Sequence, residues 1–165
     1  MIRTLRHLPQ VHLKPGELHV TDVPSLVTTV LGSCVSITLH SERDSLSAIC
    51  HAMLPEAKGG DPGTAFRYVD ESLAHMLDRF EREGVRRPDI QVKLFGGADV
   101  IRVEDRKPGA MTVGRMNLYA AQESIRREGL VLSASDIGGT VGRKLLFVTE
   151  SGMVLVKKLE RWGNP

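Results

Sequence analysis

The chain holds two cysteines, and both lie in one stretch with a histidine directly after the second of them. Cys34 follows the run Leu-Gly-Ser, and Cys50 is followed at once by His51. A thiol and an imidazole can together perform acyl transfer: the thiol attacks, and the histidine takes its proton and later returns it to the leaving group. Because a free thiol has a pKa near 8.5, only about 3% is thiolate at neutral pH, and the reaction needs such a base.

The same residues also allow interpretations without catalysis. Two cysteines are too few for a four-ligand zinc site, and the chain has no Cys-x-x-Cys pair. A disulfide is disfavoured in a cytoplasmic protein. Cys50 alternates with Ala48 and Ala52, on the opposite face of a strand from His51, so we expect it in the core. For Cys34 the spacing alone leaves both a reactive and a buried, inert thiol open.

Two neighbouring strands would have to position this chemistry. Val35, Ile37 and Leu39 alternate with polar residues, and after a turn over residues 41–45 a second strand is predicted over residues 46–54. Adjacent strands lie roughly 5 Å apart, which brings side chains on one face within reach of each other. Gly32 leaves the backbone room to present N–H groups to an oxyanion, and Thr28 and Thr29 could supply a hydroxyl.

The rest of the chain predicts one mixed α/β (α+β) domain over residues 1–165. A helical period over residues 69–80 ends at Gly84, and a second helix, with Asn117 as its expected cap, ends at Gly129. A short strand is expected before a turn at Pro24, and further strands over residues 26–30, 90–94, 130–134, 144–149 and 153–159, the last two joined by a hairpin at Ser151-Gly152. One sheet would leave a wet face, so we expect two mixed β-sheets packed together with flanking helices.

Composition excludes several function classes. Of the 165 residues, 41% are hydrophobic and 25% charged, and the formal net charge of +2 is too balanced to indicate nucleic-acid or membrane-surface binding. No apolar run approaches the roughly 18 residues that span a bilayer, and the N-terminus has no signal-peptide core, so a cytoplasmic location is expected. The two Gly-rich runs, "FGGAD" and "DIGGTVGRK", fit no nucleotide-binding spacing.

A set of motifs in this order resembles the CheD family of chemoreceptor glutamine deamidases. They are "GELHVTD", "TTVLGSCVSI", "ICHAMLP", "RYVDESLAHML", "KLFGGADV", "VGRMN" and "DIGGTVGRKLLF". Each motif is weak by itself, but the set spans nearly the whole chain. The resemblance implies a fold similar to the catalytic domain of a deamidating bacterial toxin, with two mixed sheets between helical layers.

The resemblance also implies roles for single residues. Cys34 corresponds to the family's nucleophile and His51 to its general base, and backbone amides around Gly32 and Ser33 would hold the oxyanion. The third catalytic residue of the family is a threonine six positions before the cysteine, which selects Thr28. A second threonine at position 29 departs from the usual pattern, so the choice between the two hydroxyls stays open. No metal and no organic cofactor is implied.

The implied reaction converts glutamine side chains of chemoreceptors, in their cytoplasmic helical part, to glutamate and ammonia as part of chemotaxis signalling. Hydrolysis of glutamyl methyl esters would be chemically close. An alternative is a regulatory binding module that stimulates, or is controlled by, a CheC-type phosphatase of the response regulator. Phe95, Gly96 and Gly97, with the loop of residues 56–64, are the expected cleft or partner-binding residues, and the free protein is expected to be a monomer.

Overall fold

Two β-sheets and two α-helices build the part of the chain that the computed structural model describes, which is residues 2–57, 59, 66–100 and 107–160. The strands are β1 (Gln10–His12), β2 (Leu18–Thr21), β3 (Leu26–Leu31), β4 (Val35–Ser41), β5 (Leu46–Cys50), β6 (Gln91–Gly96), β7 (Leu132–Ile137), β8 (Arg143–Val148) and β9 (Met153–Lys158). The α-helices are α1 (Val69–Arg82) and α2 (Val113–Arg127), and two 3₁₀ helices cover Ile2–His7 and Arg87–Asp89.

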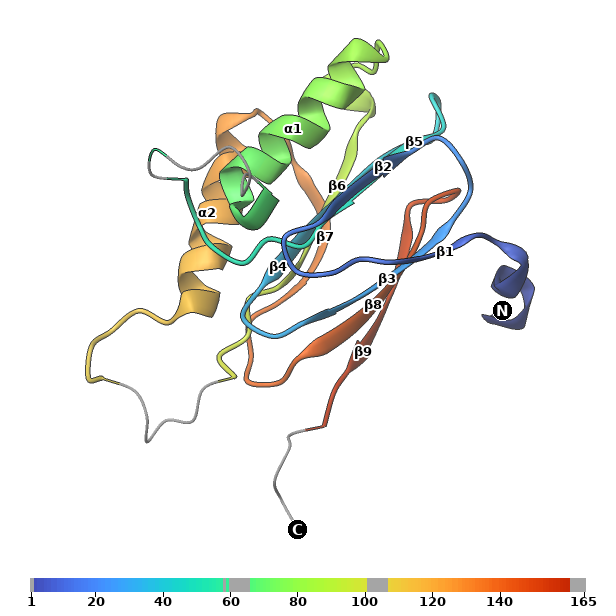
Figure 1. Cartoon of the computed structure of the whole chain (residues 1–165). Helices are drawn as coiled ribbons and strands as arrows, with labels where there is room; N and C mark the ends of the chain where they lie inside the picture. The colour runs from blue at the N-terminus through green and yellow to red at the C-terminus, as the bar shows by residue number, and fades with distance from the viewer. Residues whose placement is uncertain (1, 58, 60–65, 101–106, 161–165) are drawn as a thin grey trace.

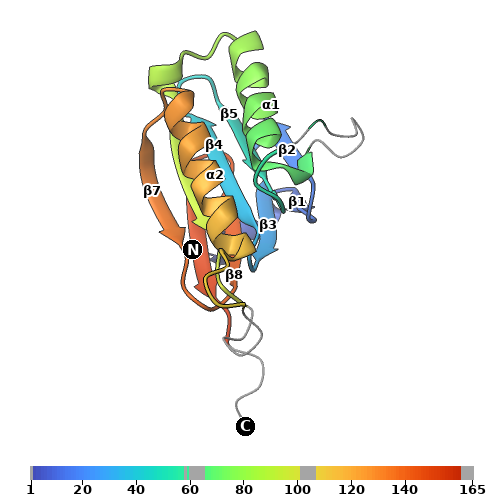
Figure 2. The same ribbon diagram turned by 90° about the vertical axis from the view of Figure 1, so that its left-hand side faces the viewer.

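The strands form one four-stranded and one five-stranded sheet. Their orders are β1-β3-β8-β9 and β2-β5-β4-β6-β7. Each sheet has one parallel pair, β1 with β3 and β6 with β7, among antiparallel neighbours. Figure 1 shows the two sheets facing each other, and Figure 2 shows α1 and α2 side by side over the outer face of the five-stranded sheet.

Alternation along the central strands divides the interior into two cores. On β4, Val35, Ile37 and Leu39 pack toward the helices, in a cluster that includes Leu73 and Phe80 of α1. The intervening residues of β4 therefore face the four-stranded sheet, since successive side chains of a strand point to opposite faces. Both faces of β4 and β5 are buried. Any polar group between the sheets must accordingly find a partner inside the protein.

The predicted fold class is confirmed, with one difference in the position of the helices. Two mixed sheets pack face to face, as expected, but α1 and α2 both cover the same sheet, so the described residues have no second α-helical layer. The outer face of the four-stranded sheet instead carries partly exposed side chains such as Thr28 and Val30. Neither α1 nor α2, the α-helices of the described ranges, is long and apolar enough to cross a bilayer.

The predicted cap of the second helix is wrong. Helix α2 begins at Val113, and its N-cap is Thr112, whose hydroxyl accepts a hydrogen bond from the backbone N–H of Arg115. Asn117 lies inside the first turns of α2 and is completely buried. A buried amide in a helix interior needs partners from elsewhere in the fold, and those partners lie in the candidate site.

Candidate functional site

Residues 32–34, which we call the Cys34 loop, connect β3 to β4 and are held from behind by their carbonyl groups. Three donors bind the three carbonyl oxygens in turn: Ala98 N to Gly32 O at 3.0 Å, Asn117 Nδ2 to Ser33 O at 3.0 Å, and Gly97 N to Cys34 O at 2.9 Å. In a trans peptide the N–H points opposite to the C=O, so the N–H groups of Ser33 and Cys34 face away from these donors. Within the described residues, no backbone acceptor meets the N–H groups of the loop. The N–H groups of Ser33 and Cys34 therefore have no backbone partner, and the Cys34 N–H lies beside its own sulfur.

His51 directly follows β5 and is fixed by its backbone and by its ring. Its N–H donates to Glu17 O at 3.0 Å, and its carbonyl accepts from Gly16 N at 2.9 Å. His51 as a whole is only 2% exposed, and its Nδ1 lies 2.7 Å from Thr29 Oγ1. The side chain can therefore neither rotate freely nor exchange its partner for water.

The partners of Thr29 decide which ring nitrogen of His51 carries the proton. Thr29 Oγ1 donates its one hydrogen to the carbonyl oxygen of Leu13, at 2.8 Å. The hydroxyl can then only accept from His51, so Nδ1 bears the ring hydrogen and Nε2 keeps a free lone pair. This is the tautomer that a general base needs when it removes a proton through Nε2.

Thr28 and Thr29 point to opposite sides of β3. Thr29 is buried between the sheets, whereas Thr28 is partly exposed and its Oγ1 lies 2.6 Å from Nδ1 of His12. The hydroxyl that contacts His51 is thus that of Thr29, and Thr28 pairs with a different histidine on the outer face. The physical reason is the two-residue period of a strand, which puts one of two adjacent threonines on each face.

Cys34 and His51 are diagonal neighbours across an antiparallel pair. The bridge between Val35 and Ala52, with backbone bonds of 3.0 and 2.9 Å, continues the pairing of β4 and β5 up to the Cys34 loop. Diagonal side chains on one face are about 7–8 Å apart or less at Cβ, which long side chains can span. Cys34 is partly exposed and packs against the cluster of Leu31, Phe95 and Leu145 between the sheets. The thiol therefore lies on the same face as the His51 ring.

Burial keeps both groups neutral in the resting protein. Desolvation raises the pKa of the Cys34 thiol, partly offset by its own backbone N–H. Desolvation also lowers the pKa of His51, partly offset by the Leu13 carbonyl and by the charge of Glu17. Both shifts disfavour a standing thiolate–imidazolium pair. The arrangement instead suits proton transfer at the moment of attack.

The residues expected to line a cleft or partner surface are buried; they are Phe95, Gly96 and Gly97. Gly96 pairs with Val35, and a side chain at Gly97 would collide with Leu118 of α2. These residues support the Cys34 loop from below and offer no open surface in this structure. The loop of residues 56–64, expected beside them, lies largely outside the described residues.

A buried arginine explains the second Gly-rich motif. Arg143, 2% exposed, binds Asp136 through Nε at 2.8 Å and donates to Gly138 O at 2.7 Å and Gly96 O at 3.3 Å. Gly138 N also donates to Gly96 O, at 2.9 Å. The motif therefore fastens the end of β6, which in turn carries the backbone donors to the Cys34 loop.

Sequence reasoning missed two polar residues of the site. Ser36 is the strand partner of His51 on the same face, and its hydroxyl is buried without a partner among the described residues. Its shared face with Cys34 could have been read from the period of two. Asn117 was seen only as a cap. Its inward position is set by helix phase, which one polar residue in an amphipathic pattern does not reveal.

Cys50 lies in the core, as its alternation with alanines predicted. It is fully buried, its sulfur accepts from Ile37 N at 3.4 Å, and burial raises the pKa of its thiol to about 11. Both cysteines are free thiols. In the described ranges, no group of three or more His, Cys, Asp or Glu side chains is arranged to hold a metal ion.

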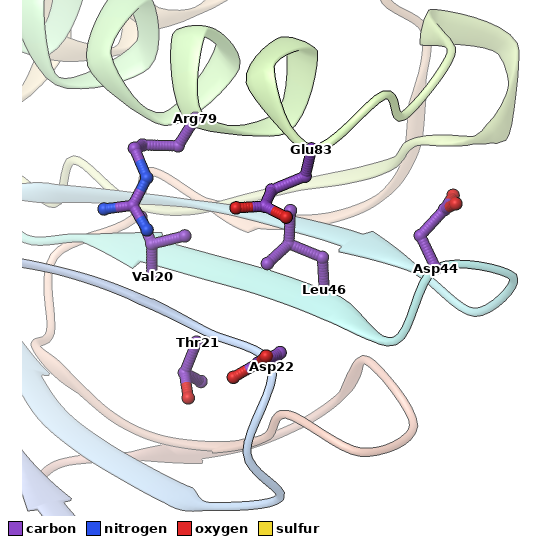
Figure 3. A pocket seen from close by; sticks show the side chains of 7 residues that line it. All are labelled: Val20, Thr21, Asp22, Asp44, Leu46, Arg79 and Glu83. Atoms are coloured by element: carbon purple, nitrogen blue, oxygen red, sulfur yellow. The ribbon is translucent and has the colours of Figure 1, made fainter.

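A surface cavity lies apart from these residues, between β2, the turn after β4 and the end of α1 (Figure 3). Its volume is about 270 Å³, and its lining is Val20, Thr21, Asp22, Asp44, Leu46, Arg79 and Glu83. The lining contains neither a thiol nor an imidazole. This cavity therefore contributes nothing to acyl-transfer chemistry.

Fold and site together define an α/β sandwich with a cysteine, a histidine and a histidine-bound threonine at one end of its inter-sheet space. The model of the family described as CheD chemotactic sensory transduction matches residues 53–158. The chain belongs to the CheD family, which confirms the resemblance seen in its motifs.

Similar proteins extend this match over nearly the whole chain. The chain is 48% identical over 160 residues to the probable chemoreceptor glutamine deamidase CheD 2 of Geobacter sulfurreducens, covering 96% of each chain. The probable deamidases of Maridesulfovibrio salexigens and Methanococcus maripaludis are 42% and 32% identical, covering 92% and 88% of this chain and 93% of each relative. A Bacillus licheniformis protein titled hypothetical protein YfiH shares 15% identity at a TM-score of 0.48, over 75% of this chain and 50% of its own.

Proposed function

We propose that this protein is a chemoreceptor glutamine deamidase that acts in chemotaxis through a cysteine nucleophile. Cys34 attacks the side-chain carboxamide of a receptor glutamine, and His51 is the general acid and base. Thr29 orients His51, a role expected for Thr28 from the family pattern. The free N–H groups of the Cys34 loop stabilise the oxyanion. The substrate is the helical cytoplasmic part of a receptor, and the free thiols fit a cytoplasmic setting.

In the acylation half of the reaction, the thiol proton passes from Sγ of Cys34 to Nε2 of His51 as Sγ bonds to the amide carbon. The carbonyl oxygen becomes an oxyanion beside the Cys34 N–H. His51 then returns the proton to the amide nitrogen, the C–N bond breaks, and ammonia leaves a thioester on Cys34.

In the second half, His51 takes a proton from water, and the resulting hydroxide attacks the thioester carbon. The C–S bond breaks, glutamate is formed and the proton returns to the thiol. A glutamyl methyl ester would enter the same sequence with methanol as leaving group, which would make ester hydrolysis a second activity of the same site.

The observation that carries this proposal is the bonding of His51, which leaves Nε2 as a base on the face that Cys34 shares. The test is to incubate the protein with a receptor cytoplasmic fragment and follow ammonia release and peptide mass. Conversion of defined glutamines to glutamates is expected. A fragment with unchanged mass and no ammonia, over several receptors of the source organism, would contradict the proposal.

The two threonines should differ strongly in their effect. Thr29→Ala removes the acceptor that holds Nδ1–H of His51, and we expect kcat to fall by about 10- to 1000-fold, as for the loss of an uncharged orienting group. Thr28→Ala, the matched control one residue away, should change kcat by less than about 3-fold, because its hydroxyl contacts His12 outside the site. Steady-state kinetics of both variants measure this. A silent Thr29→Ala with a damaged Thr28→Ala would show that Thr28 is the third member.

The pH dependence follows from the direction of the His51 shift. His51 must be neutral to act as base, and burial lowers its pKa below the ordinary 6.5. We therefore expect kcat/KM to rise with pH, to reach half of its plateau below pH 6.5, and to be level through neutral pH. A pH–rate profile of the wild-type protein tests this, and an acid limb centred above pH 7 would contradict it.

Control of, or by, a CheC-type phosphatase stays a prediction. The residues expected to bind such a partner, Phe95, Gly96 and Gly97, are buried under the Cys34 loop and α2. A partner that reached them would have to displace one of these elements. Titration with a purified phosphatase in the presence of receptor fragment would show whether the two bind together.

A further inference from the structure

Among the described residues, Asn117 is the one side chain that bonds to both strand segments of the site. Its Nδ2 donates to Ser33 O in the Cys34 loop and to Met53 O, two residues after His51, each at 3.0 Å. Both partners are carbonyl oxygens, so only the NH₂ group can face them, and both of its hydrogens are used. The orientation of the amide is therefore determined by chemistry.

The bond to Ser33 O acts on the peptide unit that contains the Cys34 N–H. The Ser33 carbonyl and the Cys34 N–H belong to one planar trans unit and point in opposite directions. Pulling the oxygen toward α2 turns the N–H away from α2, to the open side of the loop.

The first turn of α2 approaches the site closely enough for this contact because two glycines remove the obstacle. A Cβ at Gly114 would lie 2.5 Å from Ala98 O, and a Cβ at Gly97 would lie 2.3 Å from the Leu118 side chain. Asn117 itself is fully buried, and its Oδ1 has no partner among the described residues. A buried acceptor without a donor lowers the stability of the fold. An apolar residue at a purely structural position would avoid this loss.

We propose that Asn117 is a positioning residue that aims the Cys34 N–H at the oxyanion and keeps the Cys34 loop in register with the segment after His51. This inference deepens the proposed thiol mechanism and rests on it. Asn117 does not touch the reacting atoms. It acts through the peptide unit between Ser33 and Cys34.

Two reagents separate this role from general support of the fold. Acylation of Cys34 by p-nitrophenyl acetate passes through an oxyanion, whereas alkylation by iodoacetamide does not. In Asn117→Asp, which keeps the shape but replaces the NH₂ donor, acylation should slow by about 100- to 1000-fold, as when an oxyanion donor is lost. Alkylation should stay within about 3-fold of wild type, so that the ratio of the two rates falls. Asn117→Leu, volume-matched and uncharged, should behave in the same way.

The control is Ile125→Ala, a core truncation in the same helix that destabilises without touching the site. It should leave the ratio of acylation to alkylation unchanged. An unchanged ratio in both Asn117 variants, or equal slowing of the two reactions, would overturn the proposal. Because neither reagent is a receptor, absence of deamidation by the wild-type protein would refute the proposed function and still leave this ratio to decide the role of Asn117.

Discussion

Replacing Cys34 with alanine is expected to lower deamidation by about 10⁴-fold or more, to the level of the uncatalysed reaction, because no covalent intermediate can form. Cys34 is partly exposed and contributes little to the core, so the variant should fold. Release of ammonia from a receptor fragment, followed over hours, measures the residual rate. The oxyanion donors are backbone groups and remain in place, so receptor binding should be largely kept.

Cys50→Ala is the matched control, since it removes the other thiol of the chain. Its sulfur is fully buried and its thiol pKa is raised to about 11, so it is neither accessible nor ionised at neutral pH. We expect activity within about 3-fold of wild type and a loss of stability of about 1 kcal/mol, from the small cavity left behind. Equal loss of activity in the two folded variants would remove the nucleophile assignment from Cys34.

Replacing His51 with asparagine should lower kcat by about 10²- to 10⁴-fold, which is the usual contribution of a general acid–base group. Asparagine keeps an amide donor for Thr29 but has no group that takes up a proton. Since burial raises the pKa of the Cys34 thiol, the variant would also lack an adequate supply of thiolate. Its remaining activity should therefore increase with pH up to and beyond the ordinary thiol pKa of about 8.5.

His12→Asn is the control for this change, because His12 also contacts a threonine hydroxyl on β3 but lies exposed on the outer face of the four-stranded sheet. Its kcat should equal that of wild type within about 3-fold. A His51→Asn variant with the activity of His12→Asn would mean that another group moves the proton. The threonine comparison and the pH profile would then lose their basis as well.

The local pattern of the sequence was sufficient for most of the strands and for both α-helices. Alternating apolar residues over β4 and β5 and the helical period of α1 predicted these elements, because burial on one face imposes period 2 or 3.6 on the chain itself. Side-chain chemistry marked Cys34 and His51 as candidates and left an inert thiol open, and their proposed roles came from the resemblance to the CheD family. Two sheets followed from the number of strands, each with one face to bury.

The local pattern of the sequence did not predict which face of β3 points into the interior. Leu26, Thr28 and Val30 form one face of β3, and Val27, Thr29 and Leu31 the other. The two sets are equally apolar, so no periodicity distinguishes them. Pairing with β1 and β8 and packing against β5 put the second set inside, and this selected Thr29 as the partner of His51.

Contacts between distant segments were likewise decided only in the folded chain. Asn117 bonds to Ser33 and Met53, which precede it in the sequence by 84 and 64 positions. The end of β6 lies beneath the Cys34 loop because β6 pairs with β4. Such contacts depend on how the sheets and helices stack, which is a sum over many side chains rather than a property of one segment. The sequence by itself therefore determined which residues are candidates for the chemistry, whereas the tertiary structure determined which neighbours contact them.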